Sequence, residues 1–201
     1  MALNFANNNS LSAITTQPSG LSGSAITLLS TQTASSSATI SFTSGIDSTY
    51  DEYVFKFIDI HPATDGANLT FQSSTNTGSS YGLTATTTCF ISRHHEDDSA
   101  TALVYQSSDD EAQSTNFLRL SSGSGNDNDQ SLVGTLHLFQ PSSTTFVKHF
   151  ICRNQYYNDS NISIDWYMSG YFNTTSDVDA IQFKFSSGNI DSGVIKLYGV
   201  S

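Results

Sequence analysis

Apolar and polar residues alternate along most of this 201-residue chain with the two-residue period of a β-strand. The clearest case is 161–172, where Ile162, Ile164 and Trp166 share one face and polar residues occupy the other. Residues 53–60 are apolar on nearly both faces, which predicts a central strand. Short segments of this kind, separated by turn sequences, predict an all-β protein.

The alternation continues from residue 38 to the end of the chain and gives nine or ten short strands. We expect them at residues 38–43, 53–60, 68–72, 84–92, 100–106, 132–139, 145–152, 161–172, 180–185 and 194–200. The Gln-Pro-Ser-Ser-Thr sequence at 140–144 favours a tight turn, and the last two strands are expected to form a closing hairpin. A few helical turns fit only around Ser107–Ala112. The pattern predicts an antiparallel, jelly-roll-like β-sandwich.

Residues 1–37 differ from the rest because they contain no charged side chain and are rich in Ser, Thr, Asn and Gln. Such a segment cannot collapse on its own, so it is either disordered or an extended arm that adds to a neighbouring subunit. Regularly placed apolar residues favour the assembly arm, namely Phe5, Leu11, Ile14, Leu21, Ile26, Leu28 and Leu29. The expected organisation is an N-terminal arm over 1–37 and a β-sandwich domain over 38–201.

The charge of the chain excludes two classes of partner. Charged residues make up 12% of the sequence and the formal net charge is −11, whereas a nucleic-acid-binding protein needs a basic surface. The same acidity repels anionic lipid headgroups. No run approaches the roughly 18 apolar residues that span a bilayer, and the start lacks the basic and apolar regions of a secretory signal. We therefore expect a soluble protein made in a cytoplasm, with neither nucleic acid nor membrane as partner.

Three acidic segments are candidate cation sites, at 93–98, 109–111 and 123–129. Adjacent histidines on an extended chain point in opposite directions, so His94 and His95 are poorly placed to share one metal ion. The 123–129 segment lacks the glycine and the final glutamate that a helix–loop–helix calcium site requires. Asn and Asp also serve as ordinary turn residues, so we expect surface loops here, without metal or other cofactor.

The sequence offers no catalytic constellation, and we expect the protein not to be an enzyme. It lacks a Gly-x-Ser-x-Gly elbow, a glycine-rich phosphate loop before a helix and a context for an activated cysteine. His61, His137 and His149 lie in or beside strands, where structural roles are commoner. Cys89 and Cys152 are interpreted as two separate buried thiols, with a disulfide between neighbouring strands as the alternative.

Aromatic residues near the C-terminal part of the chain are the candidate binding residues. Tyr156, Tyr157, Trp166 and Tyr167 can form either the core and rim of a sandwich or a platform for a sugar or a protein partner. We take Tyr156, Tyr157 and Tyr167 as the candidate partner- or glycan-binding surface.

Several turn and strand sequences together resemble a family of small virion proteins from tailed, especially marine, bacteriophages. They lie at 44–50, 59–62, 144–150, 169–175 and 186–199, and the resemblance extends from about residue 38 to the end. These motifs specify a fold better than a role. The resemblance implies a structural or tail-fibre-like component of a virus particle.

Within that class, the sequence leaves more than one role open. Because there is no coiled coil or fibre repeat, we expect a capsid decoration or cement protein on the virion surface, with its arm reaching across a neighbouring subunit. Its partners would be other virion proteins of capsid or tail, and a homo-oligomer is expected, with a trimer suggested by analogy. The alternative is a short tail fibre or adhesin that binds host surface glycan. A carbohydrate-active enzyme with paired acids is the third hypothesis.

Overall fold

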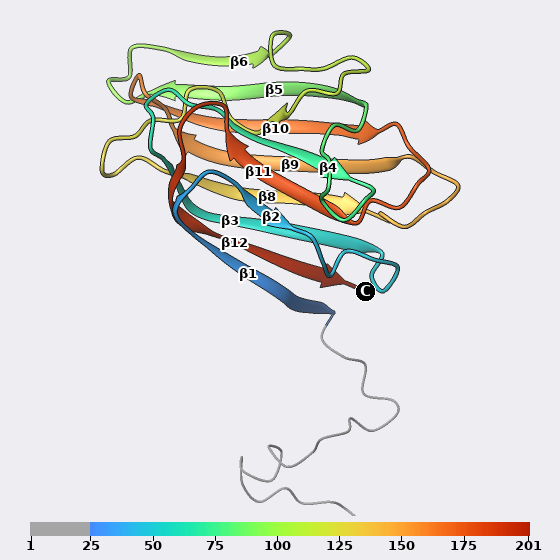
Figure 1. Ribbon diagram of the computed structural model, residues 1–201. Helices are drawn as coiled ribbons and strands as arrows, with labels where there is room; N and C mark the ends of the chain where they lie inside the picture. Colours follow the sequence, from blue (N-terminus) through green and yellow to red (C-terminus); the bar gives the residue numbers. More distant parts are fainter. Residues whose placement is uncertain (1–24) are drawn as a thin grey trace, which may run out of the picture.

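The computed structural model describes residues 25–201, which form a two-layer β-sandwich without a helix (Figure 1). Its strands are β1 (Ile26–Ser37), β2 (Ile40–Phe42), β3 (Glu52–Pro62), β4 (Leu69–Ser74), β5 (Ala85–His95), β6 (Thr101–Tyr105), β7 (Leu118–Arg119), β8 (Leu132–Phe139), β9 (Lys148–Tyr157), β10 (Ile162–Phe172), β11 (Ala180–Phe185) and β12 (Ile190–Val200). The expected all-β sandwich is confirmed.

The two layers differ in size. One sheet has eight strands in the order β1-β12-β3-β8-β9-β10-β5-β6, and the other has four in the order β2-β11-β4-β7. All neighbouring strands are antiparallel. The four-stranded sheet lies over one face of the eight-stranded sheet, and β1 and β6 form the two edges of the larger sheet (Figure 1).

The core between the layers is built from aromatic rings. Phe183 of β11 lies 5.4 Å from Phe55 and 5.2 Å from Phe57 between ring centroids, both in edge-to-face arrangements. Phe71 of β4 packs in the same way 5.2 Å from Phe150 of β9. Edge-to-face packing aligns the positive rim of one ring with the negative face of another, which adds to the gain from burial. Each of these rings joins one sheet to the other.

Most strands lie where the alternation predicts them. β8 and β11 have the predicted bounds, and the predicted turn sequence at 140–144 lies between β8 and β9, which pair antiparallel. Ile162, Ile164 and Trp166 are buried, as their shared face predicts. Residues 107–112 form turns and coil instead of the helical turns considered from the sequence.

The expected closing hairpin is wrong. β11 pairs with β2 and β4 in the small sheet, whereas β12 pairs with β1 and β3 in the large sheet. Residues 186–189 therefore carry the chain from one layer to the other. Two apolar strands joined by a short Ser/Gly/Asn segment look the same in sequence whether they pair or cross between layers, so periodicity could not distinguish the two.

The last twelve residues of the expected arm, 26–37, form β1 and pair with β12 of the same chain. Ile26, Leu28 and Leu29 lie in this edge strand, and Leu29 packs against the core. The absence of charge, which set this segment apart in sequence, is equally compatible with an edge strand rich in Ser and Thr. The other apolar arm residues lie outside the described residues, namely Phe5, Leu11, Ile14 and Leu21.

Candidate interaction surface

The face of the eight-stranded sheet that points away from the small sheet carries exposed apolar side chains. Alternation along β9 shows how they arise, because Phe150 and Cys152 face the core while Ile151 and Arg153 face outward. Ile151 is 53% exposed, and Phe90 on β5 is 43% exposed. Side chains on one face of neighbouring strands stand close enough to form a continuous surface.

An aromatic stack lies on this face between β10 and β5, toward the β6 edge of the sheet. Phe90 of β5 and Tyr167 of β10 are directly paired across the two strands, and their rings are parallel to within 4° with centroids 4.7 Å apart. Tyr167 is also paired with Arg153 of β9, whose guanidinium lies 4.9 Å from the centre of the tyrosine ring. The guanidinium is attracted by the electron-rich face of the ring.

Asp165 holds the Arg153 guanidinium and the Tyr167 hydroxyl in place by hydrogen bonds. It accepts hydrogen bonds from Arg153 Nε at 3.1 Å and Nη2 at 2.7 Å, and another from the Tyr167 hydroxyl at 3.0 Å. The hydrogen bond from Arg153 is the main reason that the pKa of Asp165 lies below its usual value. The carboxylate in turn raises the pKa of Tyr167. We call Phe90, Ile151, Arg153, Asp165 and Tyr167 the outer-face platform.

Two shallow hollows adjoin the outer-face platform. A 230 Å³ hollow lies among Phe90, Ile151 and Tyr167, and a 480 Å³ hollow beside it is lined by His149 and Tyr171 among others. The small side chains Thr88 and Ser169 line both hollows. The face is therefore uneven on the scale of a side chain or a sugar ring.

A second apolar region lies at the β1 end of the same face. Ile26 and Leu28 of β1 are 57% and 51% exposed, and Val54 and Tyr198 lie in the neighbouring strands. A hollow of 470 Å³ there is lined by Ile26, Glu52, Val54, Lys56, Thr135, His137, Tyr198 and Val200. His137 Nδ1 lies 2.5 Å from Glu52 Oε1 within it, and Lys56 and Thr135 add further polar groups to the lining.

The three tyrosines taken from the sequence do not lie together. Tyr156 is fully buried, because it follows Phe150 and Cys152 on the inner face of β9. Tyr157 points outward at the end of the strand, where its hydroxyl donates to Glu96 Oε2 at 2.5 Å and its pKa is raised to about 12. Tyr167 alone belongs to the outer-face platform.

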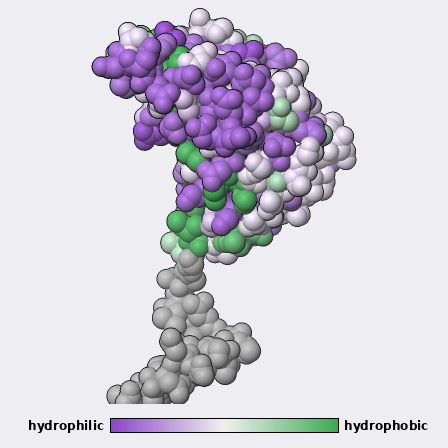
Figure 2. Space-filling model, turned by 90° about the vertical axis from the view of Figure 1, so that its left-hand side faces the viewer, coloured by the Kyte–Doolittle hydropathy of each residue, from purple (hydrophilic) through white to green (hydrophobic). Residues whose placement is uncertain are grey.

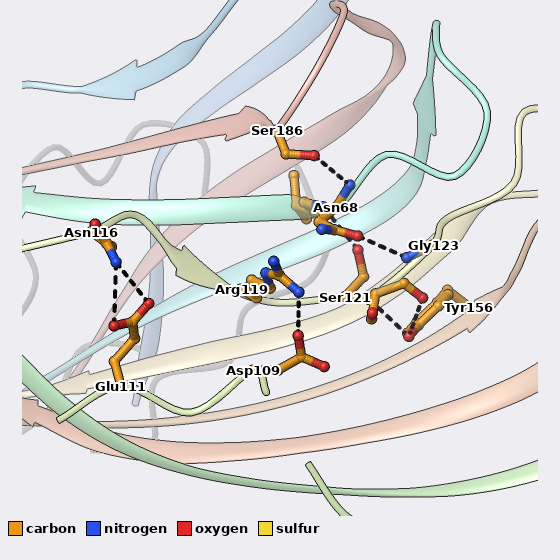
Figure 3. Close-up of polar contacts among 11 residues, drawn as sticks. Asn68, Asp109, Glu111, Asn116, Arg119, Ser121, Gly123, Tyr156 and Ser186 are labelled. Atoms are coloured by element: carbon orange, nitrogen blue, oxygen red, sulfur yellow. Dashed lines mark hydrogen bonds and ion pairs between the residues drawn. The ribbon is translucent and has the colours of Figure 1, made fainter. Parts of the chain in front are cut away.

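Tyr156 instead belongs to a network of polar contacts inside the sandwich (Figure 3). Its hydroxyl donates to the Ser122 carbonyl at 3.0 Å and accepts from the Ser122 amide at 2.9 Å. Nearby, Asn68 Oδ1 accepts from the Gly123 amide at 2.8 Å, and Ser121 Oγ accepts from the Leu69 amide at 2.8 Å. These bonds anchor the 120–124 segment to both sheets, so the role of Tyr156 is structural.

Arg119 and Asp109 form an ion pair in the same region (Figure 3). The Asp109 side chain is buried, whereas the Arg119 side chain remains partly exposed. Nearby, Glu111 Oε1 accepts a hydrogen bond from the side-chain Nδ2 of Asn116 at 3.1 Å. The carboxylates of the 109–111 segment thus have partners within the protein.

The end of the sandwich that carries the 93–98 segment is strongly hydrophilic over its upper part (Figure 2). His94 Nε2 lies 3.0 Å from Asp98, and the Asp127 carbonyl lies 3.2 Å from His61 Nε2. Within residues 25–201, no group of three or more His, Cys, Asp or Glu side chains is arranged to hold a metal ion. In the same range, no helix is long and apolar enough to cross a membrane.

Cys89 and Cys152 are free, buried thiols. Both are cross-strand neighbours of Met168, so β10 lies between β5 and β9 and keeps the backbones of the two cysteines two strand spacings apart. Burial raises the pKa of Cys89 to about 12 and raises that of Cys152 as well. The thiols therefore stay protonated at neutral pH, which makes them inert as nucleophiles.

Comparison with known proteins adds little to this description. No family model matches the sequence, and no curated protein is similar to it. A solved structure from Bacteroides ovatus, described as of unknown function, shares 8% identity and has a TM-score of 0.28. The match covers 51% of this chain and 45% of that one. A likeness at this level carries no argument about fold or function.

Proposed function

We propose that the protein is a non-enzymatic structural component of a bacteriophage particle, displayed on the capsid as a decoration or cement protein. The outer-face platform is the observation that carries this proposal. Exposed aromatic and aliphatic side chains beside an arginine are the composition typical of protein–protein interfaces. The sequence resemblance described above supplies the phage context.

The platform is suited to docking because its side chains are already held in place. Arg153 is fixed by two hydrogen bonds to Asp165, and Tyr167 is held between Arg153 and Phe90. The residues lie on adjacent strands of a wide sheet, so little backbone order has to be gained on binding. Preorganisation of this kind lowers the entropic cost of association.

The ionisable groups near the platform support a binding role over a catalytic one. Asp165 is ion-paired and its pKa is lowered, so it is a poor proton donor near neutral pH. The nearby thiols are buried and protonated. Across the whole chain, the net charge of −11 favours solubility where many copies are displayed close together.

The proposal is tested by the number of copies per purified phage particle. Quantitative mass spectrometry would compare this chain with the major capsid protein in the same sample. We expect a ratio near one, or a fixed large fraction of it. A handful of copies per particle would contradict capsid decoration and would place the protein in the tail.

The alternative is a short tail fibre or adhesin that binds host surface glycan. The 480 Å³ hollow favours it, because Tyr171 and His149 line this hollow together with the hydroxyls of Thr86, Thr88 and Ser169. Aromatic faces with adjacent polar groups suit sugar rings. This role predicts few copies per particle and a binding isotherm with purified host polysaccharide that is weakened by Tyr171→Ala.

A further inference from the structure

We propose that the free edge of β6 accepts residues 1–24 of a second copy of this chain as an added strand. Strand addition to an exposed sheet edge gains main-chain hydrogen bonds along the whole added segment. This inference goes beyond the proposed function, because it concerns how copies of the chain join one another wherever they are located.

The β6 edge lacks the usual protection of an exposed strand. Natural edge strands carry charges, prolines or bulges that prevent pairing with other chains. Thr101–Tyr105 contains neither a charge nor a proline, and its pairing with β5 is continuous. The opposite edge, β1, has a register shift between Leu28 and Ser30 and a positive φ of 50° at Ser36. Of the two edges of the large sheet, β6 is therefore the more open to pairing with another strand.

Apolar side chains are exposed on both faces of β6. Leu103 is 75% exposed and Tyr105 is 55% exposed on the outer face, while Val104 on the opposite face is 36% exposed. β6 lies at the margin of the large sheet, beyond the strands that the small sheet covers (Figure 1). An added strand would contact these side chains on both of its faces, which is the burial that such pairing requires.

The hydrogen-bonding pattern of β6 leaves three residues open to a new strand. The Ala100 carbonyl accepts from the His95 amide at 3.0 Å, and the Gln106 amide donates to the Cys89 carbonyl at 2.9 Å. In an antiparallel pair, inward and outward groups alternate along the strand. The backbone groups of residues 101, 103 and 105 therefore point away from β5, where the described chain places no further strand.

The acidic residues at both ends of β6 favour an uncharged added strand over a second copy of β6. Glu96, Asp97 and Asp98 precede the strand, and Asp110 and Glu111 follow it. Antiparallel pairing of β6 with β6 of a second copy would bring these two acidic ends together, and like charges at such positions repel. An uncharged strand avoids this repulsion, and the sequence carries no charged side chain before Asp47.

The N-terminal segment has the length and composition that this edge requires. Fully extended, 24 residues reach about 80 Å, whereas the eight-stranded sheet is about 34 Å wide at 4.8 Å per strand spacing. The segment joins β1, at the opposite edge of the sheet, and supplies Leu11 and Ile14 for contact with Leu103 and Val104. To reach its own β6 it would have to cross the six strands between β1 and β6 without main-chain partners from the sheet. A second copy has no such obstacle.

Such a contact is head-to-tail, since the edge of one copy receives the segment of the next. Contacts of this kind close into rings or continue as open chains, depending on the rotation between copies. The trimer expected by analogy is one closed form.

Two full-length variants test the proposal. Leu103→Pro removes an amide that points away from β5, so it blocks addition without removing a bond of the β5–β6 ladder. Leu11→Asp combined with Ile14→Asp leaves the edge intact and gives the segment the same charge as the ends of β6. Sedimentation velocity over a range of concentrations should show oligomers for the parent and a monomer for each variant.

Mixing the variants gives the decisive result. The first retains an intact segment and the second an intact edge, so an equimolar mixture should form a one-to-one dimer that neither forms alone. Equal melting temperatures for the parent and Leu103→Pro would confirm correct folding, and Leu103→Lys replaces the proline variant if they differ. A monomeric parent, a variant that assembles like the parent, or a mixture that stays monomeric would overturn the proposal. None of these results depends on copy number per particle.

Discussion

The two faces of the eight-stranded sheet are built from alternate residues of the same strands, yet they have opposite environments. Phe150 and Ile151 are adjacent on β9, and their exposed fractions are 1% and 53%. The inner face is covered by the four-stranded sheet, and its rings interlock across the layers. The outer face has comparable side chains, and residues 25–201 place no second layer over it. Burial of the inner face holds the fold together, which leaves the outer face free to bind.

The largest expected difference between the faces comes from placing a charge on each. Phe183→Asp puts a carboxylate among Phe55, Phe57 and Phe71 in the fully buried core. We expect a loss of more than about 4 kcal/mol in the free energy of unfolding, which prevents stable folding of a typical domain. Circular dichroism and thermal melting would measure it.

The matched change on the outer face is Phe90→Asp, which removes the stack on Tyr167 but leaves the carboxylate in water. This change should lower the free energy of unfolding by about 1 kcal/mol. If both variants melt alike, the assignment of the two faces is wrong.

A pair of tyrosines gives the next largest contrast. Tyr156→Phe removes the hydroxyl that satisfies both the amide and the carbonyl of Ser122 inside the protein. We expect a loss of about 1–3 kcal/mol in denaturant unfolding, because buried polar groups are left without partners. Tyr167→Phe removes one partly buried hydrogen bond to Asp165 and should lower the free energy of unfolding by less than about 1 kcal/mol. Equal losses would show that Tyr156 does not anchor the 120–124 segment.

Ile151→Thr should separate stability from association. The new residue keeps the β-branched shape that suits a strand, and the side chain is exposed, so the free energy of unfolding should change by about 0.5 kcal/mol or less. Its occupancy on purified particles should fall about tenfold, which corresponds to about 1.4 kcal/mol of binding. Undiminished occupancy at equal stability would exclude Ile151 from the docking surface.

The smallest effect concerns the ion pair of the platform. Both side chains are partly exposed, so Asp165→Asn should lower the free energy of unfolding by about 0.5 kcal/mol at pH 7. The pKa of Asp165 is lowered in the folded state, so its contribution is present above the ordinary pKa of 3.8 and is lost as the pH falls through the lower folded value. Urea unfolding at several pH values should show that the free energies of unfolding of the parent protein and of Asp165→Asn converge below pH 3.8. If the two free energies still differ there, the ionised Asp165 carboxylate is not the source of the difference.

Strand positions were largely predictable because one face of each strand is buried. Burial imposes the two-residue period, and the predicted bounds of β8 and β11 match the structure. β1 was missed as a strand because an edge strand rich in Ser and Thr has a weak apolar pattern. β7 has only two residues, Leu118 and Arg119, too few for any period to show.

The interaction surface was less predictable, for a different reason. Extending the alternation of β9 by four residues would have placed Tyr156 in phase with Phe150 and Cys152, and so inside. The stack of Phe90 on Tyr167 depends on the pairing of β5 with β10, strands that lie more than 60 residues apart in sequence. Register between distant strands is set by tertiary packing, which a single sequence does not reveal.

Hydroxyl-radical footprinting of the free protein and of purified particles would show whether the outer-face platform is covered on the particle. We expect labelling of Phe90, Ile151 and Tyr167 to fall strongly on the particle, while Phe146, which is 65% exposed and outside the outer-face platform, stays labelled. Unchanged labelling of the outer-face platform on particles that carry the protein would contradict the claim that this face is the docking surface.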